Sequence, residues 1–372
     1  MLNFIKEKND VWSKLLAARK PIILYGMGNG ADKILDWCEK NGVKISGIFA
    51  SDGFVRYQQF RGFTVCSYQD IIERFGEDIL IVIAFASEIP EVLAKFKELA
   101  EKHEVLAPHL SLFAEEETVS CQWLEKYEQQ LQYVYDRLAD EKSREVFAAA
   151  LNYKLSGDIR YLLACETDRK ADLKELFTWG KQEIYLDLGA YNGDTVQEFL
   201  ELTDGSYRKI VAVEPDRRNF KKLEKLHETL RDNFVTCQKG IWSQSEEKGF
   251  SDSGGRQSTL MAGQKNIIPV DTIDNICGDD PVTYIKMDVE GAEKEALNGG
   301  RIVISKYHPK ILAAAYHYDA DIFLLPLLLW QLVPEYKVYL RKHPYIPAWE
   351  LNFFCCHLAG HEKSKKDEKR QM

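Results

Sequence analysis

The sequence predicts an α/β protein with two parallel sheets, and three observations support this prediction. Short apolar runs alternate with helical patterns in both halves of the chain, which is how parallel sheets are built. Two of these runs, at residues 21–25 and 184–188, lead into glycine-containing turns. Two β-rich runs near the end, at 336–341 and 349–357, predict an antiparallel pair that closes the second sheet.

The composition argues against several classes of protein. The chain has 372 residues, of which 45% are hydrophobic and 12% aromatic, enough for the packed cores of two or three domains. Its formal net charge of −9 argues against a nucleic-acid-binding surface, which carries clustered basic side chains. The richest apolar run, Ile322–Trp330, contains a proline and is about half the length that spans a bilayer, so we expect no membrane span.

The cysteines indicate a reducing environment. None of the eight forms a Cys-x-x-Cys pair, which favours reduced, mostly buried thiols over a disulfide framework or a metal site. The first residues lack the long apolar core of a signal peptide. We therefore expect a cytoplasmic protein.

Residues 1–112 are expected to form an N-terminal Rossmann-like domain. The predicted strands are 21–25, 43–49 and 79–84, and the predicted helices are 32–41 and 92–102.

The first turn of this domain fits the dinucleotide pattern through Gly26, Gly28 and Ala31, and Asp52 lies about where a ribose partner should be. Either this turn binds a nucleotide or sugar nucleotide, or it is kept for tight packing and binds nothing. No Tyr-x-x-x-Lys pair in this segment provides hydride chemistry.

Residues 113–178 are expected to form a helical connector. Apolar side chains at three- and four-residue steps predict one amphipathic helix over 124–138. Asp140 is a predicted N-cap for a second helix over 141–155, which stops at Gly157. The connector would dock on one of the α/β units or form the seam of a homo-oligomer.

Residues 179–360 carry the candidate chemistry. We expect strands at 184–188, 210–213, 234–238, 266–270, 283–287 and 310–315, with a turn at 239–242 and a polar, glycine-rich loop at 251–258. Ile241 or Trp242 would lie at the ligand edge, although Trp242 is equally explained by packing. The charged tail, residues 361–372, is expected to be disordered.

The turn after the strand at 184–188 has the features of a nucleoside site. Gly189 and Gly193 let a ligand approach the backbone. Glu214, at the end of the next strand, would accept the two hydroxyl protons of a ribose. Asp187, two residues before the first glycine, suits a ligand with a cationic head better than it suits a pyrophosphate.

These residues resemble those of the FkbM-type S-adenosylmethionine-dependent methyltransferases. Three motifs in the right order carry the resemblance: Asp187-Leu-Gly-Ala-Tyr-Asn-Gly193, Val213-Glu-Pro215 and Lys286-Met-Asp-Val-Glu-Gly-Ala-Glu293. The resemblance covers roughly the second half of the chain. It implies a class I methyltransferase domain over residues 179–360, with a mostly parallel seven-stranded sheet and a terminal antiparallel hairpin.

The resemblance also implies S-adenosylmethionine as the methyl donor and a hydroxyl of a sugar or glycan precursor as the acceptor. Alignment of donor and acceptor is the main task of such an enzyme, so the mechanism requires no metal. The expected donor-binding residues are Asp187, Gly189, Tyr191, Asn192, Gly193, Glu214, Gly240, Ile241 and Asp288.

Two residues are candidates for taking up the proton of the acceptor. His317 follows the predicted strand 310–315, and the FkbM-like pattern has a Tyr-His pair followed by an acid here. Histidine suits a base near neutral pH, although His317 would alternatively bind substrate or cap the strand. Asp288 is the second candidate. Glu290 and Glu293 lie at a predicted helix start, where acids stabilise the helix dipole, and we adopt this interpretation for Glu293.

Two other functions are kept as alternatives. One is a nucleotide-dependent oxidoreductase or epimerase that uses Gly26, Gly28 and Asp52. The other is a catalytically silent scaffold that binds the donor. The acceptor, the methylated atom and the oligomeric state do not follow from the sequence.

Overall fold

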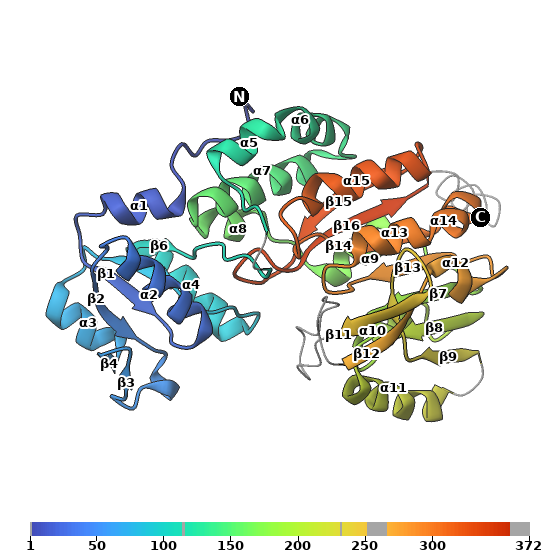
Figure 1. Ribbon diagram of the computed structural model, residues 1–372, viewed down its shortest axis with the longest axis horizontal. Coiled ribbons are helices and arrows are strands. Elements are labelled where there is room, and N and C mark those ends of the chain that lie inside the picture. Colours follow the sequence, from blue (N-terminus) through green and yellow to red (C-terminus); the bar gives the residue numbers. More distant parts are fainter. Residues whose placement is uncertain (1, 114–115, 231–232, 251–265, 358–372) are drawn as a thin grey trace, which may run out of the picture. The chain divides into compact units, whose positions relative to one another are not determined.

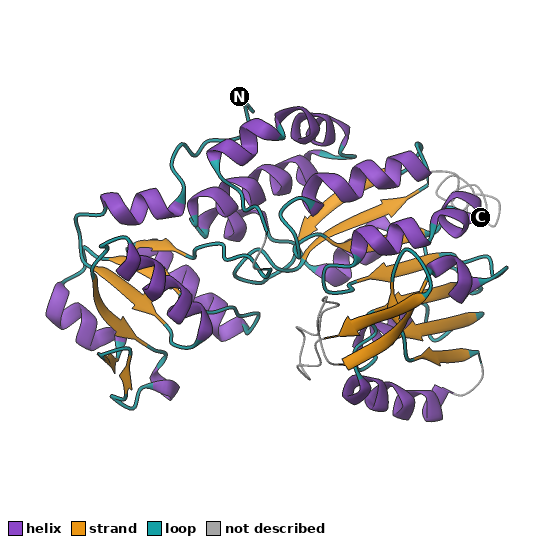
Figure 2. Cartoon of the chain, in the orientation of Figure 1, coloured by secondary structure: helices purple, strands orange, loops and turns teal. Residues whose placement is uncertain are grey.

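The structure of the protein is a computed structural model that describes residues 2–113, 116–230, 233–250 and 266–357 (Figure 1). The chain forms two compact units, and Figure 2 shows their helices and strands. Of the described residues, the first unit comprises those within 2–135, 144–167 and 342–350, and the second comprises those within 136–143, 168–341 and 351–357. The units therefore do not follow the three consecutive segments expected from the sequence, because the chain passes between them several times.

The described part of the first unit contains a six-stranded sheet. Its order is β3 (Gln59–Phe60), β4 (Phe63–Cys66), β2 (Ile45–Phe49), β1 (Ile22–Tyr25), β5 (Leu80–Ile83) and β6 (Glu104–Leu106). Strand β1 is central and pairs in parallel with β2 and β5. Its side chains alternate between two cores, with Ile22 and Leu24 in one and Ile23 and Tyr25 in the other.

The helices of this sheet are α2 (Asn29–Lys40), α3 (Tyr68–Phe75) and α4 (Pro90–Lys102). Helix α2 begins three residues before the predicted start, because Gly28 adopts a φ of 111° and caps the helix. A side chain at Gly26 would collide with the ring of Phe85, 2.4 Å from the ideal Cβ position. Close packing thus explains Gly26, while nothing lies within 4 Å of a Cβ at Gly28.

Further helices belong to the region expected to be a connector. They are α5 (Cys121–Lys126), α6 (Glu128–Arg137), α7 (Glu141–Ser156), α8 (Arg160–Cys165) and α9 (Arg169–Leu176), and α1 (Val11–Ala17) precedes them all in the chain. The prediction of a single helix over 124–138 was wrong in one respect. The backbone leaves helical geometry at Tyr127, and this break separates α5 from α6. Asp140 does cap α7, accepting the backbone N–H of Ser143 at 2.8 Å.

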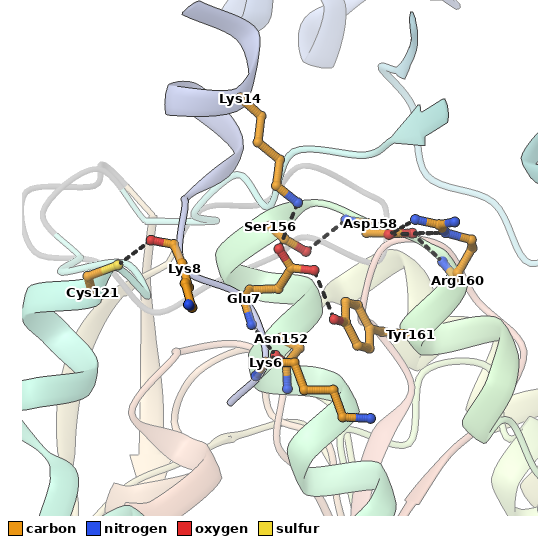
Figure 3. Close-up of polar contacts among 10 residues, drawn as sticks. All are labelled: Lys6, Glu7, Lys8, Lys14, Cys121, Asn152, Ser156, Asp158, Arg160 and Tyr161. Carbon is orange, nitrogen blue, oxygen red and sulfur yellow. Dashed lines mark hydrogen bonds and ion pairs between the residues drawn. The ribbon is translucent and has the colours of Figure 1, made fainter. Parts of the chain in front are cut away.

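The N-terminal segment is tied to helix α7 by polar contacts (Figure 3). The side-chain oxygen of Asn152 accepts the backbone N–H groups of Lys6 and Glu7 at 2.7 and 3.0 Å. The Glu7 carboxylate in turn accepts the hydroxyl of Tyr161 and pairs with Lys14, both at 2.8 Å. Residues far apart in the sequence are thus joined within the first unit.

Residues 342–350, which join the last two strands, complete the first unit. Ser87 and Ile346 exchange two backbone hydrogen bonds, of 2.8 and 3.0 Å. Ile346 and Ala348 are buried in the same core as Tyr153 and Tyr25. A fragment that ends near residue 113 would therefore lack part of its own core.

The described part of the second unit contains the expected seven-stranded sheet. Its order is β15 (Lys337–Lys342), β16 (Leu351–Cys356), β14 (Lys310–Ala314), β13 (Tyr284–Met287), β7 (Ile184–Leu188), β8 (Lys209–Val213) and β9 (Phe234–Cys237). The strands from β14 to β9 are parallel, and β16 runs antiparallel to β14. The mostly parallel sheet with an antiparallel end is confirmed.

Besides α9, the second unit has helices that connect its strands in the usual α/β manner. They are α10 (Asp194–Leu202), α11 (Arg217–Leu230), α12 (Ile273–Cys277), α13 (Glu293–Gly299), α14 (Arg301–Tyr307) and α15 (Asp321–Leu332). None of the described helices is long and apolar enough to cross a membrane.

Two local predictions in this unit were wrong. The predicted turn at 239–242 contains a short strand, β10 (Gly240–Ile241), which pairs with β12 (Asn266–Asp271) beside β11 (Glu246–Phe250). Glu290 does not start a helix, because it adopts a φ of 54° in a turn and α13 begins at Glu293. The predicted loop at 251–258 and the predicted tail at 361–372 lie outside the described residues.

We expect Ile346→Ala to destabilise the first unit by about 2 to 5 kcal/mol, because the side chain is fully buried and its loss leaves a cavity. Thermal unfolding of the full chain measures this. Ile302→Ala is the matched control, since that side chain is 68% exposed, and it should unfold near the temperature of the unmodified chain. Equal melting temperatures for the two variants would contradict the assignment of residues 342–350 to this core.

Candidate functional site

The candidate site lies at the carboxyl edge of the seven-stranded sheet. Asp187 lies near the end of β7, Glu214 follows β8, Asp288 follows β13, and His317 comes shortly after β14. The four strands are adjacent and parallel, so their carboxyl ends meet at one edge. In open α/β sheets this is the edge where ligands bind.

A buried ion pair supports the first turn at this edge. The Asp187 carboxylate is fully buried and accepts the Thr195 hydroxyl at 2.6 Å. The Lys286 ammonium lies 3.4 Å from the other Asp187 oxygen and donates to the carbonyl of Gly189 at 2.7 Å. Lys286 thus links the middle of β13 to the turn after β7.

Burial and charge act in opposite directions on this pair. Burial raises the pKa of Asp187, and the Lys286 ammonium opposes that rise. Burial acts to lower the pKa of Lys286, but the Asp187 carboxylate raises it above its ordinary value. Sequence reasoning gave Lys286 no role of its own. The available signal was a lysine inside an otherwise apolar strand.

The turn itself depends on a close approach of two strand ends. Gly189 has a φ of 76°, and a Cβ there would lie 1.9 Å from the carbonyl oxygen of Asp288. Gly193, with a φ of 88°, caps helix α10. Tyr191 also has a positive φ of 48°, and Asn192 is exposed beside it. The predicted donor-binding residues 187–193 therefore form one tight turn.

Glu214, which follows the neighbouring strand β8, stabilises this turn by hydrogen bonds. One carboxylate oxygen accepts the backbone N–H of Tyr191 and the other accepts that of Asp216, both at 2.9 Å. Burial raises the pKa of Glu214 to about 7. Each oxygen has a second lone pair, so the carboxylate can still accept a ligand hydroxyl.

Gly240 and Ile241 lie in β10, and both are buried. Trp242, which follows them, is held by a backbone hydrogen bond to Asp271 of 2.9 Å. The Lys248 ammonium lies 4.2 Å from the centroid of the Trp242 ring. The contact with Lys248 is compatible with both interpretations of Trp242, and each stays a prediction.

Three carboxylates surround His317. Its Nδ1 lies 2.9 Å from an oxygen of Glu293, and its Nε2 lies 3.4 Å from Glu290 and 3.6 Å from Asp288. The hydroxyl of Tyr316 donates to both oxygens of Asp288, at 3.2 and 3.1 Å. We call Asp288, Glu290, Glu293 and His317 the acidic cluster.

The charges in the acidic cluster favour a protonated imidazole. Burial acts to lower the pKa of His317, but the carboxylates of Glu293, Glu290 and Asp288 raise it well above the ordinary value. Burial raises the pKa of Glu290, whereas for Glu293 the effect of burial is outweighed by His317, which lowers the pKa. A protonated imidazole donates hydrogen bonds and cannot take up a second proton. The base role expected of His317 stays a prediction.

Sequence reasoning assigned Glu293 only a helix-start role. Glu293 is the first residue of α13, but its carboxylate is fully buried, faces His317 and accepts the backbone N–H of Val289 at 2.9 Å. An acid followed five residues later by another acid carries no metal or catalytic signature, so only the fold reveals this contact.

Comparison with known proteins agrees with this geometry. Residues 187–346 match the family model of the methyltransferase FkbM domain. This chain contains a methyltransferase FkbM domain. The matched residues include the turn at residues 187–193, Glu214 and the whole acidic cluster. No curated protein matches the chain.

One solved structure shares the fold of this chain beyond residues 187–346. A methyltransferase FkbM from Methylobacillus flagellatus KT matches with a TM-score of 0.70 and 20% identity, over 90% of each chain. An rRNA methylase from Streptococcus thermophilus matches at 0.33 and 13%, over 50% of this chain and 93% of its own. Aeropyrum pernix fibrillarin matches at 0.30 and 15%, over 50% and 72%. The first match shows that both units recur together in one fold.

We expect Gly189→Ala to destabilise the chain more than Gly205→Ala. Both glycines have a positive φ, 76° and 70°, which costs an alanine roughly 1 to 2 kcal/mol. Only at Gly189 does the new Cβ also collide with backbone, whereas nothing lies within 4 Å at Gly205. Thermal unfolding of the two variants measures the difference. Equal melting temperatures would show that β7 and β13 do not approach this closely.

Proposed function

We propose that the protein is an S-adenosylmethionine-dependent O-methyltransferase that acts on a hydroxyl of a sugar or glycan precursor. The observation that carries this proposal is the meeting of the Asp187 turn, Glu214 and Asp288 at one edge of a methyltransferase FkbM domain. When bound, the donor supplies a methyl group on a sulfonium, which is already activated for displacement.

The residues of the donor turn fit such a ligand. S-adenosylmethionine has a ribose, an ammonium and a sulfonium, and the edge offers carboxylates and a turn with two positive-φ glycines. Glu214 would accept the ribose hydroxyls, and Gly189, Tyr191, Asn192 and Gly193 would hold the amino-acid part. The buried Asp187 would act through the turn that it supports. Gly240 and Ile241 would lie on the adenine side, and Asp288 would face the methyl group.

The part of the edge around Asp288 and Glu290 suits an uncharged acceptor with several hydroxyls. The side chains of Asp288 and Glu290 are 32% and 29% exposed, and carboxylates accept hydroxyl hydrogen bonds while they repel phosphates. Sugars have the matching chemistry. Asp288 and His317 are the proposed catalytic residues, and Asp288 is the more accessible of the two to an acceptor.

The reaction would take place in the cytoplasm, where sugar precursors are assembled and the eight free cysteines stay reduced. The direct test incubates the purified chain with methyl-labelled donor and uncharged sugars or glycan extracts. Mass spectrometry then locates the methyl group. Label on an oxygen of a sugar supports the proposal. Label on nitrogen or carbon, or on no pool despite donor binding, contradicts the proposed reaction.

We expect S-adenosylhomocysteine to bind more weakly as the pH falls from 8 to 6. Glu214 has a pKa of about 7, so its carboxylate is ionised above this pH and becomes protonated below it. Protonation removes charged hydrogen bonds to the ribose, each worth about 1.5 to 3 kcal/mol. Calorimetry at several pH values measures the effect.

Glu214→Gln should bind weakly at pH 8 and lose most of this pH dependence. Glu201→Gln is the control, because that exposed acid near the end of α10 pairs with Lys170 and should change neither property. Equal affinity of the unmodified chain and Glu214→Gln at pH 8 would move the ribose away from Glu214.

A further inference from the structure

We propose that Asp288, Glu293 and His317 hold a divalent metal ion at the carboxyl edge of the methyltransferase sheet. The two carboxylates come from the end of β13 and the start of α13, and the imidazole follows β14. The ion would lie in the acidic cluster, beside the donor turn, since the carbonyl of Asp288 packs against Gly189.

The distances suit a metal site. One ligand atom from each of the three side chains lies within 4.8 Å of the other two. Metal bonds to nitrogen and carboxylate oxygen are about 2.0 to 2.2 Å long, so ligand atoms around one ion are about 3.0 to 4.4 Å apart. The separations of 2.9 Å between Glu293 and Nδ1 of His317 and of 3.6 Å between Asp288 and Nε2 are close to this range.

An unsatisfied buried carboxylate oxygen also indicates a missing cation. Glu293 is fully buried, and its second oxygen, Oε2, has no hydrogen-bond partner among the described residues. The Nδ1 of His317, also buried, lies 2.9 Å from the other oxygen but without hydrogen-bond alignment. Buried polar atoms are nearly always satisfied, so an ion that binds both groups explains why they are left open.

The charge balance supports the same conclusion. Three carboxylates surround one imidazole, so a single proton on His317 leaves the acidic cluster with excess negative charge. A divalent ion would neutralise more of this charge than the proton does. Glu290, 3.4 Å from Nε2 of His317, lies near enough to add its charge to the site.

The ligand set indicates the kind of ion. Imidazole favours Zn²⁺ and other transition metals, whereas carboxylates also suit Mn²⁺, so the mixed set favours Mn²⁺ or Zn²⁺ over Ca²⁺. The buried side chains of His317 and Glu293 lie on one side of the site. The side chain of Asp288 is 32% exposed, so solvent reaches the site from its side. Three protein ligands with an open position are typical of metal sites that bind a substrate.

The role of the ion in the reaction rests on the proposed function. Its open position would receive a hydroxyl oxygen of the acceptor and hold it close to the methyl group of the donor. The existence of the site does not depend on that role, and metal binding is therefore tested separately from donor binding.

The experiment titrates Mn²⁺, and separately Zn²⁺, into the full chain after treatment with a chelator. Electron paramagnetic resonance measures free Mn²⁺, and calorimetry measures Zn²⁺. We expect one ion per chain. Asp288→Asn and His317→Gln should each weaken binding at least tenfold. Asp280→Asn is the matched control: its side chain is also 32% exposed, but it pairs with Lys209 at the opposite edge of the sheet and should bind the ion normally.

Circular dichroism checks that each variant is folded, and Asp288→Asn alone carries the test if His317→Gln does not fold. A folded chain that binds neither ion would overturn the proposal, as would unchanged affinity in Asp288→Asn, and the protonated imidazole would then be the cation of the cluster. Calorimetry with S-adenosylhomocysteine is run on the same samples. Donor binding without metal binding refutes only the metal site, and metal binding without donor binding refutes only the proposed function.

Discussion

The arrangement of the candidate site depends on the buried ion pair between Asp187 and Lys286. Two neighbouring strands each contribute one charge, and the ammonium also binds the carbonyl of Gly189. Removing either partner would leave the other as an unpaired buried charge, which is far more costly than an exposed one. The pair therefore fixes the turn after β7 against the end of β13.

Two kinds of carboxylate lie at the carboxyl edge of the sheet. Glu214 has both oxygens occupied by backbone N–H groups, so it is rigid and presents lone pairs in fixed directions. The acidic cluster has more negative charge than its single imidazole can balance, and one of its buried oxygens has no hydrogen-bond partner within the described part of the chain. A rigid, satisfied carboxylate suits recognition of a ribose, while an unsatisfied cluster suits the binding of a cation.

The two units share the chain in an interleaved way. Residues 342–350 lie between β15 and β16 of the methyltransferase sheet, yet Ile346 is buried in the core of the first unit. The first unit also needs helix α7, whose Asn152 holds the N-terminal segment. The M. flagellatus structure, matched over 90% of both chains, has the same overall fold. Neither unit is therefore a simple module that could be cut from the sequence.

The sequence by itself determined the α/β class, the mostly parallel sheet with its antiparallel end, and the glycine-containing turn between Asp187 and Gly193. These features are local, because alternating apolar runs, glycines and strand-end acids act over a few residues. Only the tertiary structure decided the surroundings of His317, the partner of Lys286 and the place of residues 342–350. Each of these depends on contacts between residues far apart in the chain: Glu293 reaches His317 only because β13 and β14 are paired. Whether a histidine is a base or holds its proton depends on such neighbours, which a pattern along the chain does not reveal.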